Sequence, residues 1–513
     1  MKGFVRLLVL LTASLLTGCI TIRSPIVVTF TPAPTTTPTS GVETQPTATP
    51  TIEATASETA TESALTPPPA ATTAVALAAS PTPTATPTFI IFAQTVEGTP
   101  GAGGNVTPVI IGPIIKPGYV VATNTPAPTP TPAGPSPTPG PSPTPLPTLR
   151  ADLLGVQIHP FIEEKDLIDL LNRVKFDIGA RWIKFQVEWE LLEPQPGERG
   201  LQFQILERFI QHCHDRDFQV MISVVSAPDW ARTPVNLAEY PNDPYPQEGP
   251  PDDYQQYANF IRFLSEHFVN RVDAIELWNE PNLQREWFNR PLGGADYMRL
   301  FNAAYQAVRS GSNPNITLVT AGLAPTGIND HVTAVDDRAF LNEMYAAGLA
   351  GYAENVVVGV HPYGWGNPPS ATCATDCDPG PDRGWDDQRF FFFQDTINDY
   401  RAIMTQHGDS NRQMWITELG WPTFDGFGVQ PDPAINFFTY LTEWDQAYYL
   451  IDALNYSQSQ PYIGRIFIWN LNWALFAGRD GIQPLEQEAG YALIRPDGSP
   501  RPVYELLRMS PKE

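Results

Sequence analysis

Two glutamates stand at the ends of apolar runs that lie far apart in the chain. IELWNEPN (residues 275–282) contains Glu280, and QMWITEL (residues 413–419) contains Glu418. Two carboxyl groups that lie close together cannot both ionise easily, so one of them stays protonated near neutral pH. The protonated group can act as a general acid and the ionised group as a nucleophile. The pair therefore predicts acid-assisted group transfer through a covalent intermediate.

Cleavage of a glycosidic bond uses this pair, and the separation of the carboxyl groups sets its stereochemistry. About 5–5.5 Å suits retention of the anomeric configuration, whereas about 6.5–9.5 Å suits inversion. Asn279 can hydrogen-bond a sugar 2-hydroxyl, a contact that strengthens in the transition state. Pro281 is expected to stop the strand and fix the backbone that follows. We expect double displacement at a glycosidic bond.

The elements that must position these glutamates form a regular alternation from residue 150 onward. Short apolar runs alternate with amphipathic stretches, a pattern typical of parallel strands covered by helices. Eight runs predict an α/β fold, a (β/α)8 TIM barrel; an open doubly wound sheet is the alternative, but no GxGxxG follows the first run. The runs are 153–158, 181–187, 219–225, 274–278, 316–322, 355–360, 413–419 and 464–469.

In such a barrel the carboxyl ends of all the strands share one rim, where active sites lie. Glu280 ends the fourth run and Glu418 the seventh, so their side chains are expected to face each other across the mouth.

All twelve tryptophans follow residue 150, and many come just after an apolar run. Trp182 and Trp415 lie within runs and are expected to fill the core. Trp189, Trp230 and Trp421 follow runs, so we expect them on the rim as platforms that stack on sugar rings.

LWNEPN and WITELGWPT resemble the acid/base and nucleophile strands of the clan A retaining β-glycoside hydrolases, with families 5 and 39 most similar, over about residues 152–510. The resemblance implies that Glu280 is the acid/base, that Asn279 is its partner at the 2-hydroxyl and that Glu418 is the nucleophile. It also implies a β-linked polysaccharide or oligosaccharide substrate, of β-glucan or xylan type.

The same resemblance implies further substrate-binding residues on the later strands. His361 and Tyr363 would follow the sixth strand, with Tyr363 hydrogen-bonding the nucleophile, and Trp469 would lie under the sugar that is cleaved. The ending YALIRPDGSPRPVYELL resembles the last strand-like turn and closing helix of such enzymes. One departure concerns Lys184, which stands five residues before Trp189 where family 5 members tend to have arginine; we expect it near the nucleophile and the substrate.

The N-terminal third has a different composition. Residues 1–19 have a basic start, a short apolar stretch and a small-residue ending, which predicts a secretory signal. The ending Leu16–Cys19 resembles a bacterial lipobox and predicts a lipidated Cys19, hence a protein anchored to the membrane at the cell surface. Residues 20–149 are rich in Pro, Thr, Ser and Ala and predict an extended linker, although 89–121 could also form a strand pair. The catalytic domain would then span 150–513.

The net charge, the cysteines and the histidines indicate which ligands and which covalent bonds to expect. The net charge of −24 disfavours nucleic acid and suits a neutral partner. Cys373 and Cys377 are close in a loop rich in Gly, Pro and Asp, so outside the cytoplasm we expect a local disulfide. Cys213 is expected to be a plain buried thiol. The seven histidines are scattered without an HExxH motif, so no metal or cofactor is expected. The barrel is expected to be monomeric.

Two other functions remain open at this point. A barrel that only holds glycan at the cell surface would use the same tryptophans without catalysis. A transglycosylase would use the same glutamates, with a sugar hydroxyl in place of water.

Overall fold

A computed structural model describes residues 145–160, 162–234, 248–377, 387–428, 438–475 and 487–513. The predicted signal, the lipidation site at Cys19 and the linker as far as residue 144 lie outside these residues, and the boundary at residue 150 stays a prediction. Among the described helices, none combines the length and apolar character that crossing a membrane requires.

Eight parallel strands close into a barrel in chain order, each paired with the next, and β8 pairs with β1 through registers such as Val156↔Ile468. The predicted fold is confirmed, and each of the eight apolar runs overlaps one strand. The strands are β1 (Leu154–Gln157), β2 (Trp182–Glu188), β3 (Gln219–Val225), β4 (Ala274–Leu277), β5 (Thr317–Thr320), β6 (Val356–Val360), β7 (Met414–Leu419) and β8 (Ile463–Ile468).

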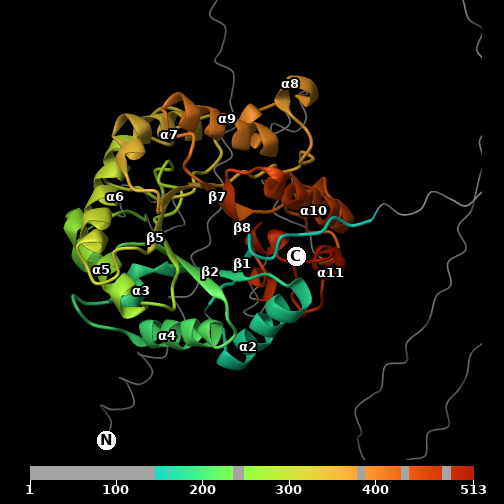
Figure 1. Ribbon diagram of the computed structural model, residues 1–513, viewed down its shortest axis with the longest axis horizontal. Coiled ribbons are helices and arrows are strands. Elements are labelled where there is room, and N and C mark those ends of the chain that lie inside the picture. The colour runs from blue at the N-terminus through green and yellow to red at the C-terminus, as the bar shows by residue number, and fades with distance from the viewer. Residues whose placement is uncertain (1–144, 161, 235–247, 378–386, 429–437, 476–486) are drawn as a thin grey trace, which may run out of the picture. The chain divides into compact units, whose positions relative to one another are not determined.

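The helices encircle this barrel (Figure 1) because each of the longer ones presents an apolar face to the strands. The longer helices are α2 (Glu164–Asn172), α4 (Leu201–His214), α5 (Tyr254–His267), α6 (Gly294–Arg309), α7 (Asp337–Ala346), α9 (Phe393–Gln406), α10 (Glu443–Ser459) and α11 (Pro502–Met509). The short ones are α3 (Trp189–Leu192), α8 (Cys373–Asp376), the π-helical η1 (Arg173–Ile178), and the 3-10 turns η2 (Asp229–Ala231), η4 (Leu349–Gly351), η5 (Arg389–Phe391), η7 (Trp473–Leu475) and η8 (Gln487–Tyr491).

Helix α4 illustrates how the sequence produces such a face. Its buried residues recur at helical spacing, and they are Phe203, Leu206, Phe209, Ile210 and Cys213. Cys213 is a free, buried thiol, as predicted, and burial raises the pKa of this thiol well above its usual range. The thiol therefore stays protonated and packs as a small apolar group.

The amino ends of the strands enclose a separate apolar cluster inside the barrel. Trp182 and Trp415 belong to it, with their ring centroids 5.4 Å apart, and both are buried. Their predicted place in the core is confirmed. This cluster closes the barrel at the end opposite to the rim on which Glu280 and Glu418 lie.

The two ends of the described chain meet at this closed end of the barrel. Leu149 N donates to Pro511 O at 2.8 Å, and Glu513 N donates to Leu149 O at 3.1 Å. Gln458, near the end of α10 and just before β8, donates to Thr148 O at 2.8 Å. The closing helix expected from the C-terminal sequence is α11.

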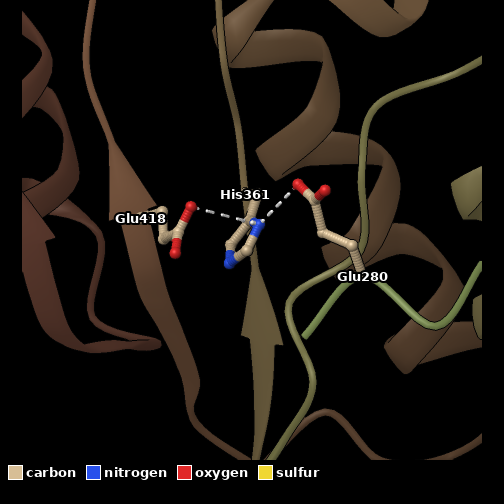
Figure 2. Close-up of side chains that lie close together, drawn as sticks. All are labelled: Glu280, His361 and Glu418. Carbon is tan, nitrogen blue, oxygen red and sulfur yellow. Dashed lines mark hydrogen bonds and ion pairs between the residues drawn. The ribbon is translucent and has the colours of Figure 1, made fainter. Parts of the chain in front are cut away.

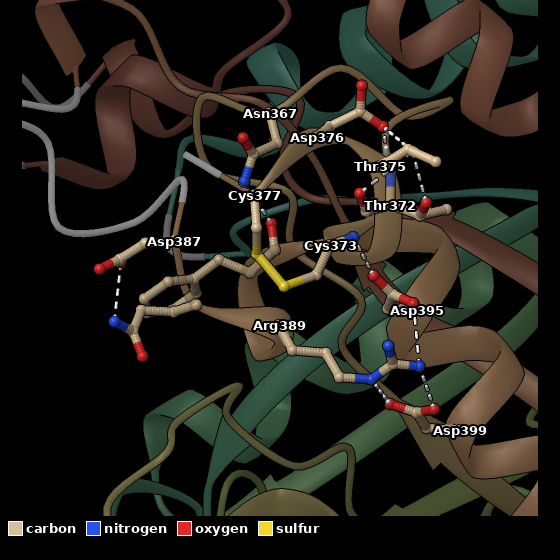
Figure 3. The surroundings of a disulfide bond; sticks show 12 residues. Asn367, Thr372, Cys373, Thr375, Asp376, Cys377, Asp387, Arg389, Asp395 and Asp399 are labelled. Carbon is tan, nitrogen blue, oxygen red and sulfur yellow. Dashed lines mark hydrogen bonds and ion pairs between the residues drawn. A yellow bond between two sulfur atoms is a disulfide. The ribbon is translucent and has the colours of Figure 1, made fainter. Parts of the chain in front are cut away.

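A disulfide joins Cys373 and Cys377, the pair expected from the sequence, in the loop that follows β6 (Figure 3). Asp395 of α9 accepts a hydrogen bond from Cys373 N at 2.6 Å. Arg389 pairs with Asp395 at 2.9 Å and with Asp399 at 2.7 Å. These contacts attach the disulfide loop to α9.

Candidate active site

Glu418 lies within β7, one residue before the strand ends, and its carboxylate is almost wholly buried. Tyr363 donates its hydroxyl to Oε2 at 2.8 Å, and Lys184 donates to Oε1 at 3.2 Å. An ionised carboxylate is purely an acceptor, so it matches two donors that approach separate oxygens. Burial, followed by the Glu418 charge, raises the pKa of Tyr363 well above its usual value, so the phenol remains a donor.

Lys184 on β2 contacts Glu418, the candidate nucleophile, and does not line the cavity described below. Its side chain is completely buried, and its Nζ lies 3.0 Å from Glu276 Oε2 and 3.2 Å from Glu418 Oε1. Burial lowers the pKa of Lys184, but the two carboxylates more than offset this effect, so the pKa is raised overall. The predicted contact of Lys184 with substrate stays a prediction, and the contacts that the structure shows are those with the two carboxylates.

Sequence reasoning missed Glu276, which lies within β4 and is completely buried. Its Oε1 accepts a hydrogen bond from Gly322 N at 3.2 Å, and its Oε2 pairs with Lys184. Burial raises the pKa of Glu276, but the charges of Lys184 and, second, of His361 lower it by more. The pKa therefore lies below its usual value. A charged residue inside an apolar run was the available signal.

Glu280 lies beyond β4, where the backbone turns out of the strand. The strand ends at Leu277, so Pro281 does not stop it, contrary to the prediction. Trp278 and Glu280 instead adopt left-handed backbone angles, with φ of 79° and 44°. Such angles are uncommon for residues other than glycine and concentrate at functional sites. Glu280 N donates to Gly322 O at 3.0 Å, which ties this turn to the segment just beyond β5.

His361 lies between the two glutamates (Figure 2). Its Nδ1 is 3.2 Å from Glu280 Oε1 and 3.8 Å from Glu418 Oε2. Burial lowers the pKa of His361, but Glu418 and Glu280 more than offset it and raise the pKa. The ring is wholly buried between the two glutamates, and its predicted role in substrate binding stays a prediction. A Cβ on Gly322 would come within 2.2 Å of the ring, which explains the glycine at that position.

The carboxyl groups of Glu280 and Glu418 are close neighbours. One oxygen of each, together with a ring nitrogen of His361, forms a set in which all atoms lie within 4.8 Å of one another. Three such atoms could hold a metal ion, but the two oxygens of Glu418 already accept hydrogen bonds from Lys184 and Tyr363.

Arg285 approaches the other side of Glu280. Its Nη2 lies 3.3 Å from Glu280 Oε2, and its Nε lies 3.6 Å from Glu286 Oε1. Glu280 is thus flanked by a histidine on one oxygen and by a guanidinium on the other, and its side chain is 14% exposed.

A cavity of about 780 Å³ opens above the two glutamates. Among the predicted residues, those that line it are Asn279, Glu280, Tyr363, Glu418 and Trp469. Tyr491, which the sequence did not single out, places its ring centroid 5.5 Å from that of Tyr363 and 5.0 Å from that of Trp469. The cavity therefore has an aromatic floor on the Glu418 side.

Residues 153–460 match the model of the cellulase family, glycosyl hydrolase family 5. The chain belongs to this family. Its barrel is therefore a glycoside hydrolase domain of clan A, as the resemblance of the two catalytic strands implied.

Solved structures similar to this family 5 domain include glycoside hydrolases of several families. A family 39 glycoside hydrolase from Bacteroides cellulosilyticus WH2 is 22% identical with a TM-score of 0.50; the match covers 71% of this chain and 64% of that one, so this chain spans less than two thirds of that protein. A GH5_18 protein from Bifidobacterium longum subsp. infantis is 11% identical with a TM-score of 0.46, over 71% and 79% of the two chains. A GH10 protein from Paenibacillus barcinonensis is 16% identical with a TM-score of 0.44, over 71% and 97%.

Three tryptophans of the family 5 domain that the sequence predicts as sugar platforms do not line this cavity. Trp189 and Trp421 are buried, and their indole N–H groups donate to Glu193 Oε2 at 2.7 Å and to Asn367 O at 2.8 Å. Trp230 is half-buried, donates to Glu193 O at 3.0 Å and lines a separate cavity of about 200 Å³. These indoles brace the loops of the rim, because each finds its hydrogen-bond partner there.

Proposed function

We propose that the barrel hydrolyses O-glycosidic bonds of a β-linked glycan with retention of configuration. The observation that carries this proposal is the close approach of the Glu280 and Glu418 carboxyl groups at the floor of one cavity. Short separations of this kind suit double displacement. The different surroundings of the two groups support different roles.

In the first step Glu280 gives its proton to the glycosidic oxygen while Glu418 attacks the anomeric carbon. The bond to the leaving group breaks, and an ester forms between the sugar and Glu418. Lys184 and Tyr363 hold the Glu418 carboxylate in position for this attack. Asn279 would bind the 2-hydroxyl, and Trp469 would support the sugar ring.

In the second step Glu280, now ionised, takes a proton from water. The water oxygen attacks the anomeric carbon, the ester breaks, and Glu418 returns as a carboxylate. A sugar hydroxyl in place of water would give transglycosylation with the same residues. A neutral glycan of β-glucan or xylan type suits a cavity that carries Glu188, Glu286 and Glu488 besides the catalytic pair.

Two measurements test the mechanism. Proton NMR should show a β-anomer as the first product from a β-linked substrate, and a 2-fluoro glycoside should label Glu418 covalently. An α-anomer formed first would indicate inversion and give Glu418 the role of a base. Absence of turnover on every β-glycan, with binding retained, would favour the non-catalytic glycan-binding alternative.

We also propose that Cys19 carries a lipid that anchors the protein at the cell surface. The support is the sequence Leu16-Thr17-Gly18-Cys19 after an apolar stretch. Fractionation of cells that express Cys19→Ser tests it, since the variant should leave the membrane fraction. An unchanged membrane association would contradict the anchor.

A further inference from the structure

The cavity has an apolar wall beyond Glu280. We use this name for six of its lining residues: Leu283, Ile328, Ala334, Trp365, Phe390 and Phe391. They come from the segments that follow β4, β5 and β6. Polar lining residues of the same segments are Gln284, Arg285, Glu286, Thr326, Thr333 and Gln388. The lining contributed by β1 and β2 is more polar and includes Gln157, Gln186 and Glu188.

The apolar wall is structurally continuous with Glu280. Leu283 N donates to Glu280 O at 3.0 Å, and Leu283 forms an antiparallel bridge with Ala334. Asn282 fixes the two segments together, because its side chain bonds Ala324 O at 2.9 Å and Val335 O at 3.0 Å. The wall therefore begins three residues from the proposed acid/base.

Three aromatic rings extend the wall. Trp365 stacks on Phe391 with ring centroids 3.7 Å apart, and the ring centroid of Phe390 lies 4.4 Å from that of Phe391. Phe390 covers Gly327, where a Cβ would come within 2.2 Å of its ring. Trp365 has a φ of 50°, an outlier for so bulky a residue, and such outliers are found where function requires a side chain in a fixed place.

The position of Glu280 decides which part of a substrate meets this wall. An acid that protonates the glycosidic oxygen lies on the side of the leaving group, whereas the sugar being cleaved lies toward Glu418 and Trp469. A second sugar could stack its ring on an aromatic face there, but its hydroxyls over the apolar side chains would lose hydrogen bonds to water, at a cost in free energy. An alkyl or aryl group would gain by burial there.

We propose that the apolar wall is a leaving-group site for an apolar aglycone, so that the substrate class includes alkyl or aryl β-glycosides. This inference rests on the proposed glycosidase function. It makes Trp365, Ile328 and Phe390 determinants of specificity that do not act in the chemical step.

A series of n-alkyl β-glycosides from methyl to octyl tests the proposal, using the glycone that the enzyme accepts best among glucose, xylose, mannose and galactose. The leaving oxygen has nearly the same acidity throughout the series, so a change in kcat/KM reports burial of the alkyl chain. We expect kcat/KM to rise by about two- to fourfold for each added methylene until the wall is covered.

Two variants test whether the dependence on alkyl length arises at the apolar wall. Ile328→Ser should lower the ratio of octyl to methyl kcat/KM, and the partly exposed position of Ile328 favours retention of the fold. Val332→Ser is the matched control, because Val332 is 72% exposed on the same segment and does not line the cavity; it should leave the ratio unchanged.

A flat alkyl series would overturn the apolar leaving-group site while leaving the glycosidase function intact. Equal effects of Ile328→Ser and Val332→Ser would also overturn it. Failure to cleave any glycoside would instead overturn the glycosidase function, and this inference with it.

Discussion

Glu418 and Glu280 are the same residue type on the same rim, yet their backbone conformations and their neighbouring side chains differ. Glu418 is held inside a strand, with Lys184 and Tyr363 on separate oxygens. Glu280 follows a left-handed turn beyond its strand and contacts His361 and Arg285 beside the cavity. A nucleophile must be fixed before the substrate arrives, whereas an acid/base must exchange protons with the leaving group and with water. The backbone and the neighbouring side chains, and not the residue type, therefore support the two different roles proposed for these glutamates.

Removal of Glu418 should produce the largest effect on this comparison. Glu418→Ala is expected to lower kcat by roughly 10⁴- to 10⁶-fold on every glycoside, because no ester can form. Steady-state kinetics on natural and aryl substrates measure this. A loss restricted to natural substrates would contradict the assignment of Glu418 as the nucleophile.

Glu280→Gln should cost less and should distinguish between substrates. We expect a loss of about 10²- to 10⁴-fold on natural glycans, because acid assistance is lost. Aryl glycosides with acidic leaving groups need little protonation, so ester formation should stay nearly normal and can be measured as a burst. Equal losses on both kinds of substrate would remove Glu280 from the role of acid.

Lys184→Met tests how the nucleophile is held. The change leaves Glu276 and Glu418 buried without their cation, so the free energy of unfolding should fall by about 3–5 kcal/mol, as measured by urea denaturation. Adding Glu276→Gln removes one of the two uncompensated charges and should restore part of the stability. If Lys184→Met and wild type unfold at the same urea concentration, the buried triad does not stabilise the fold.

The smallest effect concerns pH. The pKa of Glu276 in the folded protein is below its usual value, so its ionisation contributes stability that is fully present above the unfolded pKa and is lost as the pH falls through the lowered, folded pKa. The difference in unfolding free energy between wild type and Glu276→Gln should therefore shrink on acidification. A difference that grows as the pH falls would contradict the sign of this shift.

The sequence predicted the barrel well because each strand is a short apolar run and each helix an amphipathic stretch. It also located Glu280 and Glu418, since the ends of parallel strands must share a rim. It could not identify the Lys184–Glu276 pair. The two residues lie far apart in the sequence and come together only in the folded barrel, so a charge within one apolar run does not indicate its partner. The same limit applies to Trp189 and Trp421, whose burial depends on hydrogen-bond partners in the loops of the rim.

The meeting of Leu149 with Pro511 and Glu513 has a consequence for orientation. Both junctions lie on the end of the barrel that faces away from the cavity. A fusion partner joined at either junction would therefore meet the barrel on the end away from the cavity. An insoluble polymer could then meet the cavity without first passing the attachment.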